Sequence, residues 1–443
     1  MTRIRARLPF AALVAALLTI GAVSPAAGTD KPAPVSAPQR IGFASGDDWE
    51  PAITADRFGH LYIQYKHYDI AGGGTCRGCD LHVLVQRSDD NGRTWSKPVP
   101  IAPGPIPAQG GQYDSQIVVD PIDGRTVWAS FLQGDDSQIA VVSSTDFGRT
   151  WSKPRIVSGP RHGFDKDWLV VRGQTIAVAY DDELDSYVSV STDGGAHWAM
   201  HRMFAATDAI NLPLAAGGGI DSLGNLYFTW DSWDINHVDD GNGPVTLWVA
   251  RSSDDGATWT RHTVDVSGVP YPCTDCGFAF LSAQLTMTVG SDDAVYLLWN
   301  ATPGNAGGGP ERIYFARSTA HGRTWSKATD VSTAVPGIEH SFPAITPGPT
   351  PGDIRIAWMD MRTGDWNVFD RRSTDGGRHF GPEVQVSRSV HGYPYIHPDG
   401  FDLPYGDYFQ LTVDDLGRTQ AAWGEGPSYA GPGNIWTSAV MGG

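Results

Sequence analysis

The chain has 443 residues and a formal net charge of −17, with 49 Asp and Glu against 32 Lys and Arg. This acidic balance argues against binding to nucleic acid or to anionic membranes. Its 53 Gly, 31 Pro and 16 Trp, without long amphipathic stretches, are typical of turn-rich β structure rather than of a helical protein.

The first 27 residues have the layout of a secretory signal peptide. Arg3, Arg5 and Arg7 precede a short apolar run, and small residues follow up to Ala27. The run is too short to favour a membrane span, although an uncleaved anchor is the alternative. We expect an exported protein with a flexible lead-in over 28–37 and a single domain over 38–443. Removing three Arg from 32 basic residues leaves 29 against 49 acidic ones, a net charge of −20.

A motif of polar residues with a closing aromatic recurs six times along the chain. Its first copy, RSDDNGRTWSKP at 87–98, contains Ser88, Asp90, Gly92 and Trp95. The corresponding residues of the later copies are Ser144, Asp146 and Trp151; Asp193 and Trp198; Asp254 and Trp259; Ala320 and Trp325; and Asp375 and Phe380. An enzyme needs one active site rather than six, so the motif indicates a structural repeat.

The chemistry of the motif agrees with a structural role. Each copy follows an apolar run that predicts a strand. The Ser hydroxyl and Asp carboxylate can bond nearby backbone N–H groups, the Gly permits a positive φ, and the aromatic ring can pack on the neighbouring sheet. The motif resembles the Asp-box (BNR) repeat of the sialidase superfamily. That resemblance implies a β-propeller and places the five box Asp residues outside the catalytic set.

A second pattern counts the blades of the propeller. Seven runs that end in an aromatic residue predict the second strand of each unit, at 60–65, 126–131, 175–180, 225–230, 294–299, 353–358 and 418–423. The last unit stops after its third strand, and residues 38–44 resemble the strands that follow the boxes. We therefore predict an all-β, seven-bladed β-propeller closed by its N-terminal strand. Six blades, the number in sialidase domains, are the alternative.

Four cysteines form two short pairs, Cys76 with Cys79 and Cys273 with Cys276. In an exported protein disulfides are the default, and the pairing cannot be read from the sequence. A four-thiolate zinc site is the alternative that the spacing allows.

One position at the mouth of the central channel gathers polar residues. Aligning the first strands places Glu50, Asp114, Asp167, Gln284, Phe342 and Tyr408 there. Ring closure would join Tyr408, Glu50, Asp114 and Asp167 into one arc, and clustered carboxylates suit acid/base chemistry. A Tyr beside a Glu also resembles the nucleophile pair of sialidases. The alternatives are a solvated channel mouth or a Ca²⁺ bound by oxygen ligands; no other cofactor is expected.

The loops on the same face supply further candidates. Arg362 is the best-placed cation, although an Arg between Asp360 and Asp365 more often forms a surface ion pair. Candidate ligand-binding residues are Trp49, His67, Tyr68, Asp69, Trp233, His340 and Trp366. Some of these aromatics could stack on neutral glycan rings, or simply pin the loops. The Arg-Ile-Pro motif of sialidases is absent, which weakens that resemblance.

The sequence supports two functional hypotheses. The first is a secreted, monomeric sialidase-like enzyme, either a glycoside hydrolase or a glycan lyase, that acts on extracellular glycans. The second is a non-catalytic propeller that binds glycan or protein ligands outside the cell. Propellers host many unrelated activities, so the site has to decide between them.

Overall fold

The computed structural model describes residues 33–43, 47–68, 82–102, 111–134, 138–159, 164–182, 184–205, 212–233, 244–268, 283–302, 309–364, 366–388, 408–425 and 434–441. Contacts divide the chain into Met1–Lys31 and Pro32–Gly443, and every described residue belongs to the second unit. The described residues include no helix that is long and apolar enough to span a membrane. The signal peptide lies outside them and stays a prediction.

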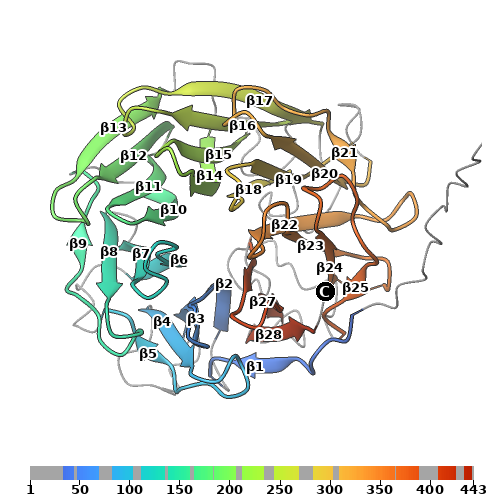
Figure 1. Cartoon of the computed structure of the whole chain (residues 1–443), viewed down its shortest axis with the longest axis horizontal. Coiled ribbons are helices and arrows are strands. Elements are labelled where there is room, and N and C mark those ends of the chain that lie inside the picture. Colours follow the sequence, from blue (N-terminus) through green and yellow to red (C-terminus); the bar gives the residue numbers. More distant parts are fainter. Residues whose placement is uncertain are drawn as a thin grey trace, which may run out of the picture. The chain divides into compact units, whose positions relative to one another are not determined.

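The described residues of the second unit form a seven-bladed β-propeller (Figure 1). Its blades are antiparallel sheets of four strands, and in blades 1 to 6 the innermost strand comes first in the chain. Blade 1 contains β2 (Asp47–Ala55), β3 (Leu61–Tyr68), β4 (His82–Ser88) and β5 (Val99–Pro100). Blade 2 contains β6 (Gln112–Val119), β7 (Val127–Gln133), β8 (Gln138–Ser144) and β9 (Arg155–Ile156). Blade 3 contains β10 (Phe164–Arg172), β11 (Thr175–Asp182), β12 (Asp185–Ser191) and β13 (Ala199–Phe204).

The remaining blades repeat this order. Blade 4 contains β14 (Leu212–Ile220), β15 (Leu226–Trp233), β16 (Val245–Ser252) and β17 (Thr260–Ser267). Blade 5 contains β18 (Leu285–Val289), β19 (Val295–Ala301), β20 (Arg312–Ser318) and β21 (Thr329–Asp330). Blade 6 contains β22 (His340–Pro347), β23 (Ile354–Asp360), β24 (Asn367–Ser373) and β25 (Val384–Gln385). Blade 7 contains β26 (Gln410–Val413), β27 (Thr419–Glu425), β28 (Asn434–Val440) and, from the start of the chain, β1 (Gln39–Ile41).

The ring closes as the sequence predicts. Strand β1 pairs antiparallel with β28, and Arg40 lies opposite Trp436. The lead-in expected to be flexible is partly ordered: Val35 bridges Val440, and the Ser36 amide donates to the Ala439 carbonyl at 2.8 Å. These contacts extend the closure beyond β1, because the edge of β28 is still unpaired where β1 begins.

The hydrophobic core is divided among the seven interfaces between blades. The middle strands are buried on both faces; in β3 and β19, for example, every described side chain is buried. This explains their continuous apolar runs, since a neighbouring blade covers each face. Six interfaces also receive the aromatic that closes a box, namely Trp95, Trp151, Trp198, Trp259, Trp325 and Phe380.

The boxes are turns between the third and fourth strands, as expected. In the first copy, the Ser88 hydroxyl donates to Asp90 at 2.8 Å, and Asp90 accepts the amide and hydroxyl of Thr94 at 2.8 and 2.7 Å. Gly92 has a φ of 80°, which favours glycine. Hydrogen bonds from Thr150 lower the pKa of Asp146, the equivalent residue of the second box, to about 2. All of these bonds are local, so the structural interpretation of the motif is confirmed.

Candidate functional site

The channel mouth is shaped by a repeated irregularity in the innermost strands. The register of β2, β6, β10 and β22 shifts by a bulge near the loop end of each strand. One residue in each bulge has a left-handed backbone: Glu50 (φ 54°), Asp114 (43°), Lys166 (50°) and Phe342 (54°). A non-glycine residue is uncommon in this region, and such conformations cluster at functional sites.

This comparison corrects the predicted alignment in the third unit. The residue equivalent to Glu50, Asp114 and Phe342 is Lys166, and Asp167 follows it by one position. Asp165 and Asp167 flank Lys166 in the sequence. An alignment shifted by one residue therefore places a carboxylate, as in units 1 and 2, where the structure has the lysine. Side chains alternate along a strand, and a shift of one residue therefore changes which group occupies the position.

Lys166 connects the residues of the predicted arc. Its Nζ lies 3.5 Å from Asp114 Oδ1, 4.0 Å from Glu50 Oε1 and 5.3 Å from the centre of the Tyr408 ring. Lys166, Asp114, Glu50 and Tyr408 come from blades 3, 2, 1 and 7. The residues of the predicted arc therefore surround the Lys166 ammonium group. Burial would lower the pKa of Lys166, but Asp114 and Glu50 raise it above its ordinary value. The ammonium is therefore charged and already paired.

Tyr408, which precedes β26 of blade 7, is anchored by blade 2 across the channel mouth. Its hydroxyl oxygen accepts a hydrogen bond from the Ser115 amide at 3.0 Å. Burial and the nearby Asp114 and Glu50 hold the pKa of Tyr408 well above 10. The phenol consequently keeps its proton at neutral pH unless a neighbouring carboxylate accepts it.

The carboxyl groups around Lys166 are reluctant to ionise. Burial, reinforced by Asp114, raises the pKa of Glu50 well above its usual value. Burial also raises the pKa of Asp114, against the effect of Lys166. For Asp167, burial and the nearby Asp114 raise the pKa to about 7. Asp167 Oδ2 accepts a hydrogen bond from the Ser130 hydroxyl, whereas Oδ1 is buried without a hydrogen-bond partner among the described residues.

A central channel of about 1020 Å³ runs along the innermost strands. At its loop end the wall contains Lys166, Asp167, Asp231, Trp233, Gln284 and Tyr408. Glu50 and Asp114 are not among the lining residues and lie behind Lys166 instead. The four polar residues predicted for the arc thus divide into two pairs: Asp167 and Tyr408 line the channel and can meet a ligand, whereas Glu50 and Asp114 contact Lys166.

Asp231 is a site residue that the sequence analysis did not single out. It lies inside the buried strand β15, and its Oδ1 accepts the Leu285 amide at 2.9 Å. Burial raises its pKa well above the ordinary value, against the effect of that hydrogen bond. A lone Asp that follows an apolar run in the sequence carries no specific signal, because its place on the channel wall depends on how blade 4 meets blades 3 and 5.

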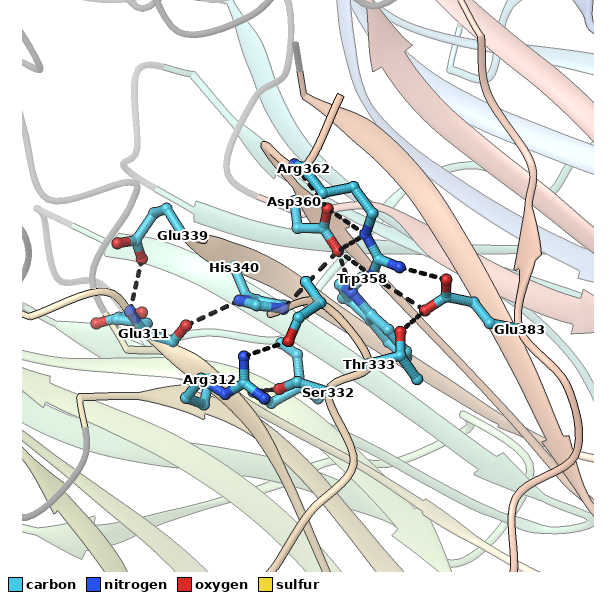
Figure 2. A network of polar contacts seen from close by, with 12 residues as sticks. Glu311, Arg312, Ser332, Thr333, Glu339, His340, Trp358, Asp360, Arg362 and Glu383 are labelled. Carbon is cyan, nitrogen blue, oxygen red and sulfur yellow. Dashed lines mark hydrogen bonds and ion pairs between the residues drawn. The ribbon is translucent and has the colours of Figure 1, made fainter. Parts of the chain in front are cut away.

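Arg362 and His340 belong to a separate network near blades 5 and 6 (Figure 2). The Arg362 Nε donates to both oxygens of Asp360 at 2.9 and 3.0 Å, and Nη2 donates to Glu383 at 3.0 Å. The guanidinium also lies 3.9 Å from the centre of the Phe369 ring. This is the ion pair that the sequence offered as the alternative, and Arg362 does not line the channel. Its predicted catalytic role is therefore replaced by a structural one.

The same network contains a pair of glutamates absent from the predictions. Glu339 Oε1 accepts the Glu311 amide at 3.0 Å, and the Nδ1–H of His340 donates to the Glu311 carbonyl at 2.9 Å. Burial raises the pKa of Glu339 to about 8, and burial, reinforced by Glu339, raises the pKa of Glu311 well above its usual value. Neither glutamate lines the channel.

Most of the predicted ligand-binding side chains are buried. Trp49, His67, His340 and Trp366 are each at most 2% exposed, and the His67 Nδ1 lies 2.7 Å from Asp48. The stacking on glycan rings predicted for Trp49 and Trp366 is therefore corrected to packing within and between blades, and the two histidines are enclosed as well. Trp233 is also buried but lines the channel. The Tyr68 side chain, Asp69 and the four cysteines, Cys76, Cys79, Cys273 and Cys276, lie outside the described residues.

Metal binding receives no support from the described side chains. Within the described ranges, no three His, Cys, Asp or Glu residues are arranged to hold a metal ion. The predicted Ca²⁺ alternative and the disulfides both stay predictions.

Comparison with known proteins places this site in context. The chain is 28% identical over 280 residues to xyloglucanase Xgh74A of Acetivibrio thermocellus, covering 58% of this chain and 30% of that protein. It is 27% identical over 264 residues to a sialidase of Bacteroides fragilis, covering 51% of this chain and 45% of the sialidase. The chain therefore spans less than half the length of these curated relatives.

Similarity to solved structures concerns the fold alone. An ulvan lyase of a polysaccharide lyase family matches with a TM-score of 0.52 and 12% identity, covering 91% of this chain and 96% of that one. The family described as the BNR repeat-like domain matches residues 30–272, more than half of the chain. With its boxes and its seven blades, the chain belongs to the BNR repeat-like domain family and is a sialidase-like β-propeller.

Proposed function

We propose that the chain is an exported, monomeric carbohydrate-active enzyme, a glycoside hydrolase of exo-sialidase or related type that acts on extracellular glycans. The position and the raised pKa of Asp167 support this proposal most. It is a buried carboxyl on the wall of the channel with a pKa of about 7. A general acid is most effective when its pKa lies near the working pH, and perturbed groups in a cavity are candidates for that role.

The neighbouring groups suit a two-step hydrolysis. In the first step Asp167 gives its proton to the glycosidic oxygen as the bond to the anomeric carbon breaks. The Tyr408 oxygen forms the new bond to that carbon, and its phenolic proton passes to the carboxylate of Glu50 or Asp114. In the second step water attacks the same carbon and gives a proton to Asp167, while Tyr408 leaves and recovers its own. Tyrosine nucleophiles of this kind occur in sialidases.

The charge of the site bears on the type of glycan. Among the described wall residues at the loop end, Lys166 is the cation, and two carboxylates already pair with it. An acidic sugar such as sialic acid would gain little there, since carboxylate recognition favours a bidentate guanidinium. We therefore favour a related hydrolase over a strict sialidase. A lyase is disfavoured for the same reason, if its substrate is a uronic acid.

A non-catalytic glycan-binding propeller is the second candidate. Its specific support is that Glu50 and Asp114 sit behind the wall and hold Lys166, as structural carboxylates would. This candidate expects a glycan that is retained by the protein but not cleaved.

The test is a glycan-array screen followed by a product assay on every glycan that binds. We expect turnover by the unmodified protein, with activity falling as the pH rises through about 7, because the general acid must be protonated. Asp167→Asn should lower kcat by about 10²-fold or more with binding retained. Asp89→Asn, an exposed change on the box face, is the matched control.

Three outcomes would count against this proposal. Unchanged turnover in Asp167→Asn would remove the assigned acid. A pH profile that is flat across neutrality would do the same. Binding without any product, over the whole set of glycans retained, would favour the non-catalytic candidate.

A further inference from the structure

The loop end of the channel has more acidic groups than its described cations can balance. Asp167 and Asp231 line the wall, and neither forms an ion pair with another described residue. Lys166, on the same wall, is already shared by Glu50 and Asp114 behind it.

Two of these carboxylates retain unused acceptor capacity. Asp167 Oδ1 has no hydrogen-bond partner among the described residues, although the side chain is 2% exposed. Asp231 binds the Leu285 amide through Oδ1, and its side chain still reaches the channel. A buried carboxylate without a partner is costly, so a cation that enters this end of the channel is stabilised there.

The wall beside Asp231 also has an apolar component. Trp233 follows Asp231 by two residues in β15, and both side chains line the channel. Ligand sites typically combine such an aromatic surface with a few polar groups that fix orientation. A bare inorganic cation would use the carboxylate and leave the indole unused, whereas a sugar can use both.

We infer that the loop end of the channel recognises a saccharide that carries a protonated amine, and that Asp231 is the residue that binds the ammonium group. The inference rests on the proposed function only in taking the ligand to be a sugar. Asp231 is then a specificity residue, and Asp167 remains the general acid. An ammonium group would stabilise the ionised form of Asp231, which burial otherwise disfavours. A neutral sugar offers no such compensation, and an acidic sugar would oppose ionisation.

The test uses three methyl glycosides that share one ring and differ in charge: those of glucosamine, glucose and glucuronic acid. Binding to the full chain is measured by calorimetry at about pH 6, where such an amine is protonated. We expect the glucosamine derivative to bind about tenfold or more tightly than the glucose derivative, as for a hydrogen bond to a charged group. The glucuronate derivative should bind most weakly.

Asp231→Asn separates recognition from folding. The Asn side-chain oxygen can still accept the Leu285 amide, so the strand contact is kept. This variant should lose the preference for glucosamine and bind the glucose derivative as the unmodified protein does. Asp89→Asn, which is remote from the channel, should keep the preference.

The outcomes distinguish this inference from the proposed function. Equal binding of the three glycosides, or preference for glucuronate, would overturn the inference, even if neutral glycans are cleaved. Ca²⁺ that abolishes glucosamine binding and raises the melting temperature would also overturn it, because the carboxylates would then hold a metal. Preference for glucosamine without cleavage of any glycan would support the inference while the hydrolase proposal fails.

Discussion

At Asp167, the proposed catalytic role and the stability of the fold oppose each other. The pKa of this buried carboxyl rises from an ordinary 3.8 to about 7 in the folded chain. Between these values the folded state binds the proton and the unfolded state has lost it. The free energy of unfolding therefore falls as the pH rises from about 4 to about 7. A pKa shift of this size lowers the free energy of unfolding at neutral pH by about 4 kcal/mol, relative to a pH at which Asp167 is protonated in both states.

Replacing Asp167 by Asn should remove this dependence. We expect the free energy of unfolding of Asp167→Asn, relative to the unmodified protein, to increase by about 2–3 kcal/mol between pH 5 and pH 8. Denaturant titrations of both proteins at the two pH values would measure it. Asp370, whose pKa is also raised to about 7, is present in both and cancels in the comparison. A difference that does not change with pH would show that Asp167 does not titrate in this range.

Single residues of the site differ in how far the sequence predicts them. Glu50, Asp114 and Tyr408 were placed correctly because their strands share a clear pattern with other units. Lys166 was missed since the bulge, which sets the register, is a backbone feature without a sequence signature. Asp231 was missed because its exposure to the channel depends on contacts between blades, and these follow from the closed ring rather than from one strand.

At the scale of a single element, the fifth box provides a natural substitution. Ala320 replaces the Asp of the other boxes, yet the Ser318 hydroxyl still accepts the Gly322 amide at 3.0 Å. The turn therefore forms without its carboxylate. What it lacks is the acceptor that binds the amide and hydroxyl of the Thr four residues later, as Asp254 does with Thr258 at 2.9 and 2.6 Å.

Restoring that carboxylate should stabilise the protein. Ala320→Asp can accept the amide and hydroxyl of Thr324, and we expect a gain of about 1 kcal/mol in the free energy of unfolding, comparable to a helix cap. Ala320→Asn, with one acceptor oxygen instead of two, should gain less. Equilibrium unfolding in denaturant measures both. A loss of stability in Ala320→Asp would mean that the fifth turn has diverged from the others.

The innermost strand of blade 4 depends on the absence of a side chain. A Cβ on Gly217 would lie 2.5 Å from Thr229 Oγ1 and 2.7 Å from the Met287 backbone nitrogen of blade 5. Backbone cannot move aside cheaply, so we expect Gly217→Ala to cost about 2–3 kcal/mol. Gly309→Ala is the matched control, because a Cβ there meets nothing within 4 Å. Thermal or denaturant unfolding would compare them, and equal stabilities would contradict the close packing of the two blades.

Strand length explains why several residues predicted to bind ligand are buried. The sequence places the end of the second strand of unit 1 at Tyr65, but β3 continues to Tyr68 and takes His67 into the sheet. Likewise β15 continues past Trp230 to Trp233, and β23 past Trp358 to Asp360. The aromatic residue that marks the end of each run lies inside the blade. Polar residues beyond it suggested loops, but they pair across the strands.

Over the whole molecule, six boxes serve seven interfaces. The interface between blades 6 and 7 receives no box aromatic among the described residues; Trp436, Ala33 and Val35 pack there instead. Two of these three come from the stretch that precedes β1. The sequence predicted the closing strand from the missing fourth strand of the last unit. It did not predict that the preceding residues also cover the interface without a box.

The N-terminal stretch should therefore decide whether the ring stays closed. Residues 33–43 supply β1, the buried Ile41 of the interface between blades 7 and 1, and the contacts of Ala33 and Val35 with the interface between blades 6 and 7. Removing residues 1–43 would expose the edge of β28 and open both interfaces. Because unpaired edges aggregate, we expect a much lower melting temperature and association on size-exclusion chromatography.

Removing residues 1–32 alone is the matched truncation, since these residues lie outside β1 and the two interfaces, and it should leave the melting temperature unchanged. A synthetic peptide of residues 33–43 should bind the 1–43 truncation and restore much of the lost melting temperature, because the edge of β28 offers the same hydrogen bonds to a strand in trans. If the 1–43 truncation melts like the 1–32 truncation and remains monomeric, closure by β1 does not hold the ring together. Rescue that persists when Ile41 in the peptide is replaced by Asp would point to the edge hydrogen bonds, rather than the apolar interface, as the source of the closure.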